Sequence, residues 1–457
     1  MRADRSRLPE PGPDPAFHFP DRVTHTLSNG LRVFTVEHHS VPVVMFSISV
    51  EGGLSADPLG KEGLAALTID LVDEGIGELS AIDVSDAFAR IGAEYDVEVG
   101  ADSSVFTLTT LSRFAARGAT LLAQILTAPS LREPDFQRVR QLRVDRLRQL
   151  KDLAPAVAER AFLRLLYRDH PYGHMAIGTE ETLSALSRAD AADFHAATFV
   201  PSRSTLVVAG ALSHQELAAL AGDAFGAWQP APGVATPSGS TAAPPPAPVT
   251  TPRVVMVPRE GAAQSELRIG HLAARRDTPD YFPLIVMNAV LGGQFVSRLN
   301  LKLREEKGFT YGARTGFDWR RQMGPFALQA SVHTAATAEA VRDCLAEFDD
   351  IRGRRPATDQ ELALAKASLT RGYPRNFETV QQLSRAVLQL SHFGLPETYF
   401  DEFVPRVNAV TADDVTRVAQ AYLDPQRTLT LVVGDRAAVE PSLAALALGE
   451  VEVLPAN

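Results

Sequence analysis

Short runs of β-branched and other apolar residues mark the first half of the chain. They are clear at 31–36, 43–50 and 104–110, and the last two alternate apolar residues with Ser or Thr, as a half-buried strand does. A longer run at 135–153 has apolar residues at mostly helical spacings and predicts a helix. Strands that are grouped with long helices, without strict alternation of the two, are typical of an α+β fold with an antiparallel sheet.

The chain divides into two similar parts around a segment that is poor in large apolar residues. That segment, 229–252, is rich in Pro, Ala, Ser, Thr and Gly and cannot bury enough apolar surface to order itself, so it is predicted to be a linker. A capped helix, a Pro turn and a β-branched strand at 186–210 recur at 410–434, with an ungapped offset of 224 residues. Helix-turn-strand units are common, but the matching Pro and Gly favour duplication. The predicted organisation is a disordered leader 1–20, an N-terminal domain 21–228, the linker 229–252 and a C-terminal domain 253–457.

Composition narrows the class of protein. A length of 457 residues predicts more than one domain, and 45% hydrophobic with 22% charged residues is ordinary for a soluble protein. No apolar stretch approaches the roughly 20 residues that span a bilayer, and the N-terminus lacks the apolar core of a secretory signal. Cys344 is the only cysteine, which fits a reducing cytoplasm. The net charge of -10 argues against nucleic acid as a partner.

One helix of the first part has the apolar setting of a zinc-peptidase helix without its ligands. Such a helix needs two histidines one turn apart and a carboxylate beside them that takes a proton from the metal-bound water. Here the two ligand positions hold Ala66 and Asp70, and the base position holds Ile69. Because Ala and Ile side chains have no lone pair to offer, this helix is predicted not to bind zinc in the usual way.

Two other groups of possible metal ligands are weaker candidates. Asp70, Asp73 and Glu74 lie at i, i+3 and i+4, which leaves another cation open, although acidic residues on a helix surface are usually a solvated face. The motif His-Pro-Tyr-Gly-His at 170–174 places two histidines four residues apart. Its Pro and Gly argue against a helix, so we interpret this turn as structural.

The second part contains a candidate substrate-binding pair. The pattern at 281–291 is helical, two glycines interrupt it, and a second helix is predicted from about 296 to 306. Lys-Gly then gives a helix C-terminal signal, and a strand is predicted to start at 309–311. Arg304 in the last helical turn and Tyr311 just beyond it can therefore converge. Tyr can donate to an oxyanion and Arg can hold a carbonyl or carboxylate, whereas the structural alternative is an exposed Arg and a core Tyr.

These motifs resemble those of the inverzincin peptidases, a group that includes pitrilysin, insulin-degrading enzyme and the mitochondrial processing peptidase. The resemblance is greatest to the short bacterial members that work as pairs of subunits, and it covers nearly the whole chain. It is carried by Gly52-Gly53 with Gly63-Leu64-Ala65, by His170-Pro171-Tyr172-Gly173 followed by Gly178-Thr179, by Pro201 to Gly210, and by Ser297-Arg298-Leu299 through Tyr311. The last block is the most specific, because its Arg and Tyr, seven residues apart, match the substrate-binding pair of the family.

The resemblance implies a fold and an altered site. The fold would be two duplicated domains, each an antiparallel sheet flanked by helices, which together form half of a clam-shaped chamber. The two zinc histidines of the family fall on Ala66 and Asp70, its catalytic glutamate falls on Ile69, and its third ligand falls near Asp145 and Arg146. The implied protein is a non-catalytic subunit that is inactive alone and holds no cofactor.

The resemblance also implies a partner. The partner would be a homologous subunit that bears His-x-x-Glu-His and holds zinc, and the pair would hydrolyse unfolded peptides. This chain would contribute Arg304 and Tyr311 to the composite site. Two alternatives remain: a structural or binding protein of the same fold, like the core subunits of respiratory complexes, and an independent peptidase that uses other residues. No Gly-x-Ser-x-Gly motif or evident Cys-His arrangement supports the last.

Overall fold

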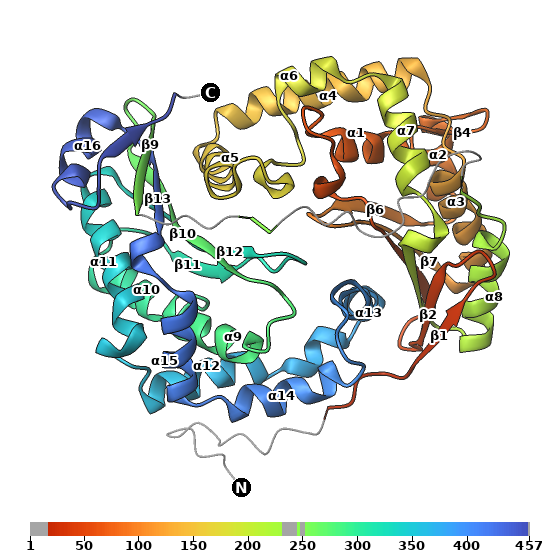
Figure 1. The fold of residues 1–457 in the computed structure, drawn as a ribbon. Helices are drawn as coiled ribbons and strands as arrows, with labels where there is room; N and C mark the ends of the chain where they lie inside the picture. The colour runs from red at the N-terminus through yellow and green to blue at the C-terminus, as the bar shows by residue number, and fades with distance from the viewer. Residues whose placement is uncertain (1–16, 231–244, 247–251, 456–457) are drawn as a thin grey trace, which may run out of the picture.

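The chain folds into two halves, and each half is built on a six-stranded sheet with helices packed against it (Figure 1). This computed structural model describes residues 17–230, 245–246 and 252–455. Most of the predicted leader, 1–16, and most of the predicted linker lie outside the described residues. The last residues of the predicted leader are packed, because Phe17 stacks on Phe377 with ring centroids 4.9 Å apart and Phe19 is buried against the second half.

The first half contains a sheet with the strand order β1-β2-β8-β3-β7-β6. Its strands are β1 (Arg22–Thr26), β2 (Arg32–Glu37), β3 (Val43–Val50), β6 (Glu94–Val99), β7 (Ser104–Leu111) and β8 (Ser204–Gly210). The short pair β4 (Gly75–Ile76) and β5 (Leu79–Ser80) lies outside this sheet. The helices of this half are α1 (Leu64–Leu71), α2 (Ala81–Ala89), α3 (Ala115–Thr127), α4 (Glu133–Lys151), α5 (Ala154–Tyr167), α6 (Glu180–Ala185), α7 (Arg188–Thr198) and α8 (His214–Phe225).

The second half repeats this architecture with the strand order β11-β12-β10-β13-β9-β14. Its strands are β9 (Arg253–Pro258), β10 (Gln264–Ala274), β11 (Ala313–Phe317), β12 (Gly324–His333), β13 (Leu429–Gly434) and β14 (Val451–Val453). Its helices are α9 (Tyr281–Leu291), α10 (Arg298–Asn300), α11 (Thr337–Asp349), α12 (Asp359–Thr370), α13 (Val380–Phe393), α14 (Tyr399–Ala409), α15 (Ala412–Tyr422) and α16 (Arg436–Ala444), with π-helical segments η5 (Leu301–Glu306) and η7 (Asp350–Arg354).

The two halves are duplicates, as the repeated pattern predicts. When each sheet is followed from its β1 or β14 edge, the order β2-β8-β3-β7-β6 of the first corresponds to β9-β13-β10-β12-β11 of the second. Local capping repeats as well: the Ser187 side chain accepts from the Asp190 amide at the start of α7, and the Thr411 side chain accepts from the Asp414 amide at the start of α15. Each pair forms a capping box, which satisfies two backbone donors at once.

The sheets differ from the expected antiparallel arrangement at one strand pair in the first half and at two in the second. β2 and β8 pair in parallel, and so do their counterparts β9 and β13, while β14 adds a second parallel pair at the edge. Strands that run in the same direction cannot be joined by a hairpin. Alternation in the sequence shows which face of a strand is buried, but it does not show the neighbour or its direction.

One helix from each half packs on the sheet of the other half. Helix α5 of the first half lies against β10 and β13, and α13 of the second half lies against β3 and β8. The α5 side of the first contact is apolar and buried, with Phe162 only 1% exposed. Its buried members are Val157, Ala158, Phe162, Leu163, Leu166 and Tyr167 from α5, with Val255, Val257, Leu272, Leu429, Leu431 and Val433 from the second sheet. Each half therefore completes the hydrophobic core of the other.

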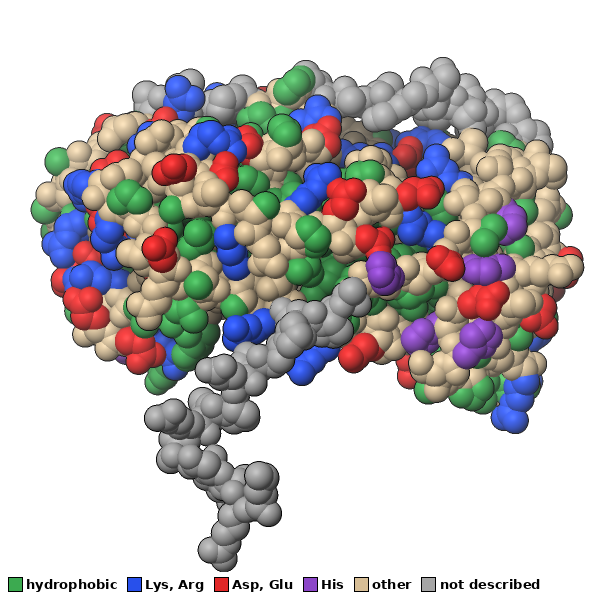
Figure 2. All heavy atoms as spheres, turned by 90° about the horizontal axis from the view of Figure 1, so that it is seen from below, with side chains coloured by type: hydrophobic (Ala, Val, Ile, Leu, Met, Phe, Trp, Pro, Cys, Tyr) green, Lys and Arg blue, Asp and Glu red, His purple; other side chains and the backbone are tan. Residues whose placement is uncertain are grey.

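The surface carries a mixture of charges. On the face seen from below, basic and acidic side chains are interspersed, without an extended basic patch (Figure 2). Nucleic-acid binding relies on a concentrated basic surface, so this face gives that function no support. Within the described part of the chain, no helix is long and apolar enough to cross a membrane.

Candidate functional site

The N-terminus of helix α1 is held rigidly in place. The Asp57 carboxylate accepts hydrogen bonds from the amides of Gly63 (2.7 Å) and Ala65 (2.6 Å). Gly63 has a φ of 95°, and a Cβ there would come within 3.0 Å of the Cα of Gly178, so glycine is required at this turn. Burial raises the pKa of Asp57 to about 6, against the opposing effect of the two amides and of His174. The apolar helix that follows is thus presented at a fixed position.

The three positions that correspond to zinc-peptidase residues carry no metal-binding set. Ala66 and Ile69 are buried in the core at 2% and 0% exposure. Asp70 is partly exposed and forms an ion pair with Arg143 of α4, whose guanidinium also donates to the carbonyl of Ala176. The Arg143 guanidinium therefore lies beside Asp70, the only carboxylate at these three positions.

The two residues that the resemblance places near the third ligand lie on the outer side of α4. Asp145 and Arg146, where the alignment places the third ligand, do not face Asp70. Asp145 accepts from Gln141 (3.0 Å) and contacts Arg148, and Arg146 donates to Gln149 (3.3 Å), all on the outer side of α4. Arg143 reaches α1 instead, because it lies one turn from Val139 and one turn from Leu147 on the buried face of α4.

The residues of this region do not fit zinc. Among the described residues, no group of three or more His, Cys, Asp or Glu side chains is placed to hold a metal ion. Glu74 is paired with Arg138, and burial together with Glu74 raises the pKa of Asp73 to about 6. The Asp70, Asp73 and Glu74 set is therefore divided between two ion pairs and the half-buried carboxyl group of Asp73. No hydrolytic step is assigned to this half.

The helix that carries Arg304 begins at Arg298 and continues through η5 to Glu306. Leu299 and Leu303 are fully buried one turn apart, which fixes the inner face of the helix. Gly308 has a φ of 63° just beyond the helix, as the Lys-Gly signal predicts.

The strand after this helix starts later than predicted. Residues 309–312 form a loop, and β11 begins only at Ala313. The expected strand start at 309–311 is therefore wrong, because Phe309 and Thr310 take part in turn contacts in place of a ladder: the Thr310 hydroxyl accepts from the Gly312 amide at 3.1 Å. Tyr311 lies in this loop with 91% of its surface exposed.

Arg304 is held by an aromatic ring and by little else. Its guanidinium carbon lies 4.1 Å from the centre of the Phe295 ring, a cation–π contact. Its Nη1 lies 3.4 Å from Glu305 and makes no hydrogen bond, although it is buried. The rest of the guanidinium is partly exposed and offers donors that suit a carbonyl or carboxylate oxygen. Tyr311 has no hydrogen bond to Arg304 in the described structure, although both side chains belong to the same end of the second half.

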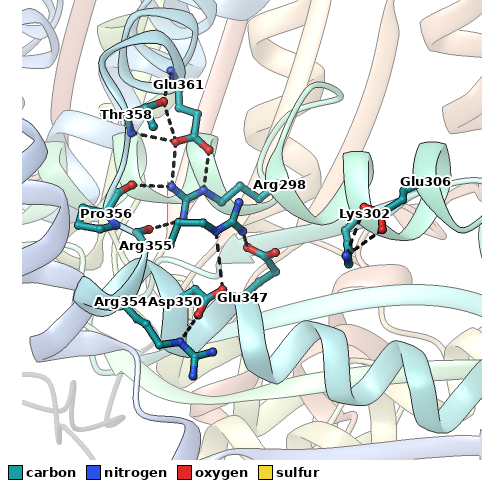
Figure 3. A network of polar contacts seen from close by, with 10 residues as sticks. All are labelled: Arg298, Lys302, Glu306, Glu347, Asp350, Arg354, Arg355, Pro356, Thr358 and Glu361. Atoms are coloured by element: carbon teal, nitrogen blue, oxygen red, sulfur yellow. Dashed lines mark hydrogen bonds and ion pairs between the residues drawn. The ribbon is translucent and has the colours of Figure 1, made fainter.

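A buried ion pair anchors the start of this helix (Figure 3). Arg298 donates to both oxygens of Glu361 at 2.6 and 2.8 Å and to the carbonyls of Arg355 and Pro356. Burial raises the pKa of Glu361, but the hydrogen bonds from Arg298 and Thr358 outweigh it and lower the pKa to about 2. The bidentate geometry fixes the helix in direction as well as in position.

Four large side chains on the segment that contains Arg304 are exposed, and one of them, Phe295, packs on Arg304. Phe295, Val296, Leu301 and Tyr311 are 65%, 52%, 47% and 91% exposed. We call these four residues the apolar patch. Large apolar side chains gathered on an exposed surface are typical of an interaction site. The sequence identifies Arg304 and Tyr311 but gives no signal for the exposed Phe295 and Val296, because the two glycines before them conceal the pattern.

A separate cavity of about 830 Å³ lies between the two halves. It is lined by Glu51, Tyr172 and Phe194 from the first half and by Arg321 and Met323 from the second, among others. Arg321 bridges the halves through Glu51 at 2.8 Å. Leu64 at the start of α1 lines this cavity, as do His170 and Tyr172 of the His-Pro-Tyr-Gly turn, whereas Arg304 and Tyr311 do not. Nothing in the sequence indicates that this turn, interpreted as structural, faces a cavity.

Comparison with known proteins agrees with this geometry. Residues 185–369 match a family model described as the peptidase M16 inactive domain. An uncharacterized zinc protease of Mycobacterium tuberculosis is 24% identical over 419 residues, 90% of this chain and 92% of that protein. A Helicobacter pylori protein named non-peptidase homolog YmxG is 22% identical over 408 residues, 88% of this chain and 92% of that protein. A crystal structure of a peptidase M16 inactive domain from Pseudomonas fluorescens has a TM-score of 0.82 at 23% identity, over 91% of this chain and 98% of that one.

Residues 185–369 thus resemble the M16 inactive domain, and the chain is similar over nine-tenths of its length to a protein named a zinc protease. These matches support a non-catalytic, M16-like protein, since the matched segment is described as an inactive domain and the positions that the resemblance assigns to zinc-site residues hold Ala66, Ile69 and Asp70.

Proposed function

We propose that this chain is the substrate-binding subunit of a heterodimeric zinc peptidase. The partner is a homologous subunit with an intact His-x-x-Glu-His helix, and peptide hydrolysis takes place at the zinc that the partner holds. The single observation that carries the proposal is the contrast between the two ends of the chain. The zinc-peptidase helix is filled by Ala66, Ile69 and the Asp70–Arg143 pair. Arg304 is partly exposed on a firmly anchored helix, and Tyr311 is largely exposed on the loop that follows it.

The exposed pair has chemistry that suits amide hydrolysis. The Tyr311 hydroxyl donates to the oxygen that becomes negative as water attacks the scissile carbonyl, and this stabilises the transition state more than the ground state. The Arg304 guanidinium holds a substrate carbonyl or carboxylate, and the partial exposure of its side chain, 31%, supports that role. The apolar patch around them supports contact with a partner or with an unfolded peptide. Cytoplasmic action is part of the proposal and is supported by Cys344 as the only cysteine.

The test is kinetic and uses the complete complex. The chain is co-expressed with a homologous protein of its own organism that bears His-x-x-Glu-His, and cleavage of an internally quenched peptide library is measured. Tyr311→Phe is expected to lower kcat by about 10²–10³-fold, with zinc content and assembly unchanged. Arg304→Ala is expected to raise KM as well. Arg371→Ala is the matched control, because Arg371 is exposed beyond α12 and lies outside the pair.

A structural or binding role without peptidase function predicts a different result. In that case, Tyr311→Phe and Arg304→Ala leave the turnover of any complex unchanged, and the apolar patch matters only for assembly. Unchanged kcat in both variants, in a complex that contains zinc and cleaves peptide, would overturn the proposed function.

A further inference from the structure

Neither member of the exposed pair is held in place by contacts of its own that would fix its geometry. Tyr311 is 91% exposed and its hydroxyl has no hydrogen-bond partner in the described structure, while Arg304 rests on Phe295 and Glu305. Oxyanion stabilisation requires donors that are already in place before the reaction. The positions of both side chains must therefore come from the backbone segments that carry them and from whatever ties those segments together.

One buried side chain ties these segments together. Asn300 is 7% exposed and lies one helical turn before Arg304. Its amide nitrogen donates to the carbonyl of Gln294 at 3.1 Å and to the hydroxyl of Ser297 at 3.2 Å. Its amide oxygen accepts from the backbone N–H of Ala313 at 2.9 Å. The Asn300 side chain thus forms three hydrogen bonds, which connect it to residues 294–297 on one side and to the start of β11 on the other.

Each of these segments carries part of the candidate site. Gln294 and Ser297, which accept from Asn300, flank Phe295 in the sequence, and the Phe295 ring packs on Arg304. The bond from Ala313 fixes the backbone two residues after Tyr311, at the point where β11 begins. We propose that Asn300 is the positioning residue of this site, and that it sets Arg304 and Tyr311 relative to each other through the Phe295 loop and the start of β11. This inference rests on the proposed function.

An asparagine is suited to this task because it has a donor and an acceptor on one short, planar group. Asn300→Asp keeps the size and the acceptor for Ala313 but replaces the donor with a second acceptor. The new carboxylate oxygen then faces the Gln294 carbonyl, so the Phe295 loop loses its tie while the start of β11 keeps its own. Loss of a buried partner also leaves acceptors unsatisfied.

The chain offers a matched control in the other half. Asn29 donates to the carbonyls of Phe225 and Trp228 and accepts from the Leu31 amide. It therefore makes the same kind and number of hydrogen bonds as Asn300, far from the candidate site. Asn29→Asp measures the loss of stability that this substitution causes away from the candidate site. An effect that only Asn300→Asp shows is therefore assigned to the role of Asn300 in the site.

The first measurement needs no partner. Hydrogen exchange of the isolated chain is expected to be at least about 10-fold faster at residues 294–297 in Asn300→Asp than in the parent or in Asn29→Asp. Ser297→Ala removes one of the three partners and serves as the milder variant where Asn300→Asp does not fold. Unchanged exchange at 294–297 in a folded Asn300 or Ser297 variant would overturn the inference.

The second measurement uses the peptidase complex and a double-mutant comparison. Asn300→Asp is expected to lower kcat by about 10–100-fold with a smaller change in KM, and to have little further effect in the Arg304→Ala/Tyr311→Phe background, because residues that act as a unit are not additive. A structural role predicts the same fractional loss in both backgrounds.

The two proposals fail in different ways. If Tyr311→Phe lowers kcat and Asn300→Asp does not, only the positioning role is wrong. If Tyr311→Phe has no effect, the proposed function is wrong, and the positioning role fails with it because no catalytic pair remains to be set.

Discussion

At the scale of single residues, the loss of metal ligands is accompanied by the gain of a positive charge. Arg143 contacts Asp70 from α4, so the region contains a guanidinium where the resemblance implies a divalent cation. Like charges at short range repel strongly in a partly buried site. Restoring the two histidines and the glutamate therefore does not restore the site by itself.

A zinc-restoration series tests this reading of the first half. Ala66→His with Ile69→Glu and Asp70→His is expected to bind less than stoichiometric zinc while Arg143 is present, because the third ligand is missing and a cation is nearby. Adding Arg143→Glu is expected to bring zinc content, measured by elemental analysis, close to one per chain.

Arg146→Glu is the control in the same triple variant. It places the same carboxylate on the exposed side of α4 and is expected not to recruit zinc. The opposite result, zinc bound with Arg146→Glu and none with Arg143→Glu, would show that the third ligand position is near Arg146, as the sequence predicts.

The residue scale also shows what a sequence can and cannot predict. Arg304 and Tyr311 could be proposed as a pair because their spacing belongs to one continuous motif. The contact of Arg143 with Asp70 could not be predicted, because α4 is distant in sequence and each residue along a helix turns the side chain by about 100°. The exposed state of Tyr311 and its separation from Arg304 depend on the loop before β11, which no periodic pattern defines.

At the scale of elements, the candidate site depends on how α10 and η5 are anchored. Arg298 is almost completely buried, with 3% of its side chain exposed, and its carboxylate partner is Glu361 at the start of α12. Removing one partner of such a pair leaves a buried charge without compensation. The sequence predicts both helices, but their joining through this pair is a tertiary contact that propensity does not contain.

Glu361→Gln is expected to destabilise the protein by about 2–4 kcal/mol at pH 7. The pKa of Glu361 is about 2 in the folded protein and about 4.3 in an unfolded chain, so its contribution is fully present above about pH 4.3 and is lost as the pH falls toward 2. The difference in the free energy of unfolding between the variant and the parent should therefore become smaller as the pH falls from about 4.3 toward 2. Urea unfolding at pH 7 and at pH 3 measures this difference.

Glu306→Gln provides the comparison for this substitution. Glu306 pairs with Lys302 at 2.9 Å and is 59% exposed, and exposed pairs of this kind contribute little. Its change in unfolding free energy is expected to stay within about 0.5 kcal/mol at either pH. A loss for Glu361→Gln that is as small, or that does not depend on pH, would contradict the anchoring role of the Arg298–Glu361 pair.

At the scale of the whole molecule, duplication was predictable and the exchange of helices was not. The offset between 186–210 and 410–434 is visible in the sequence, because each half repeats its own local pattern. The apolar face of α5 is also visible there, but a periodic pattern shows that a face is buried and not which sheet it meets. The contact between α5 and the second sheet becomes known only from the fold.

This exchange predicts that the two halves unfold together. Each half has one tryptophan, Trp228 in the first and Trp319 in the second, so Trp228→Phe and Trp319→Phe give single-tryptophan proteins that report on one half each. Their urea transitions are expected to coincide.

Phe162→Ala, in α5, is expected to lower the free energy of unfolding by about 3–5 kcal/mol and to shift both urea midpoints equally. The reason is that Phe162 belongs to the first half in sequence and to the core of the second in space. Leu142→Ala, at an exposed position of α4, should move neither. A shift of the Trp319 transition alone would show that the halves are independent and that α5 is an appendage of the second half.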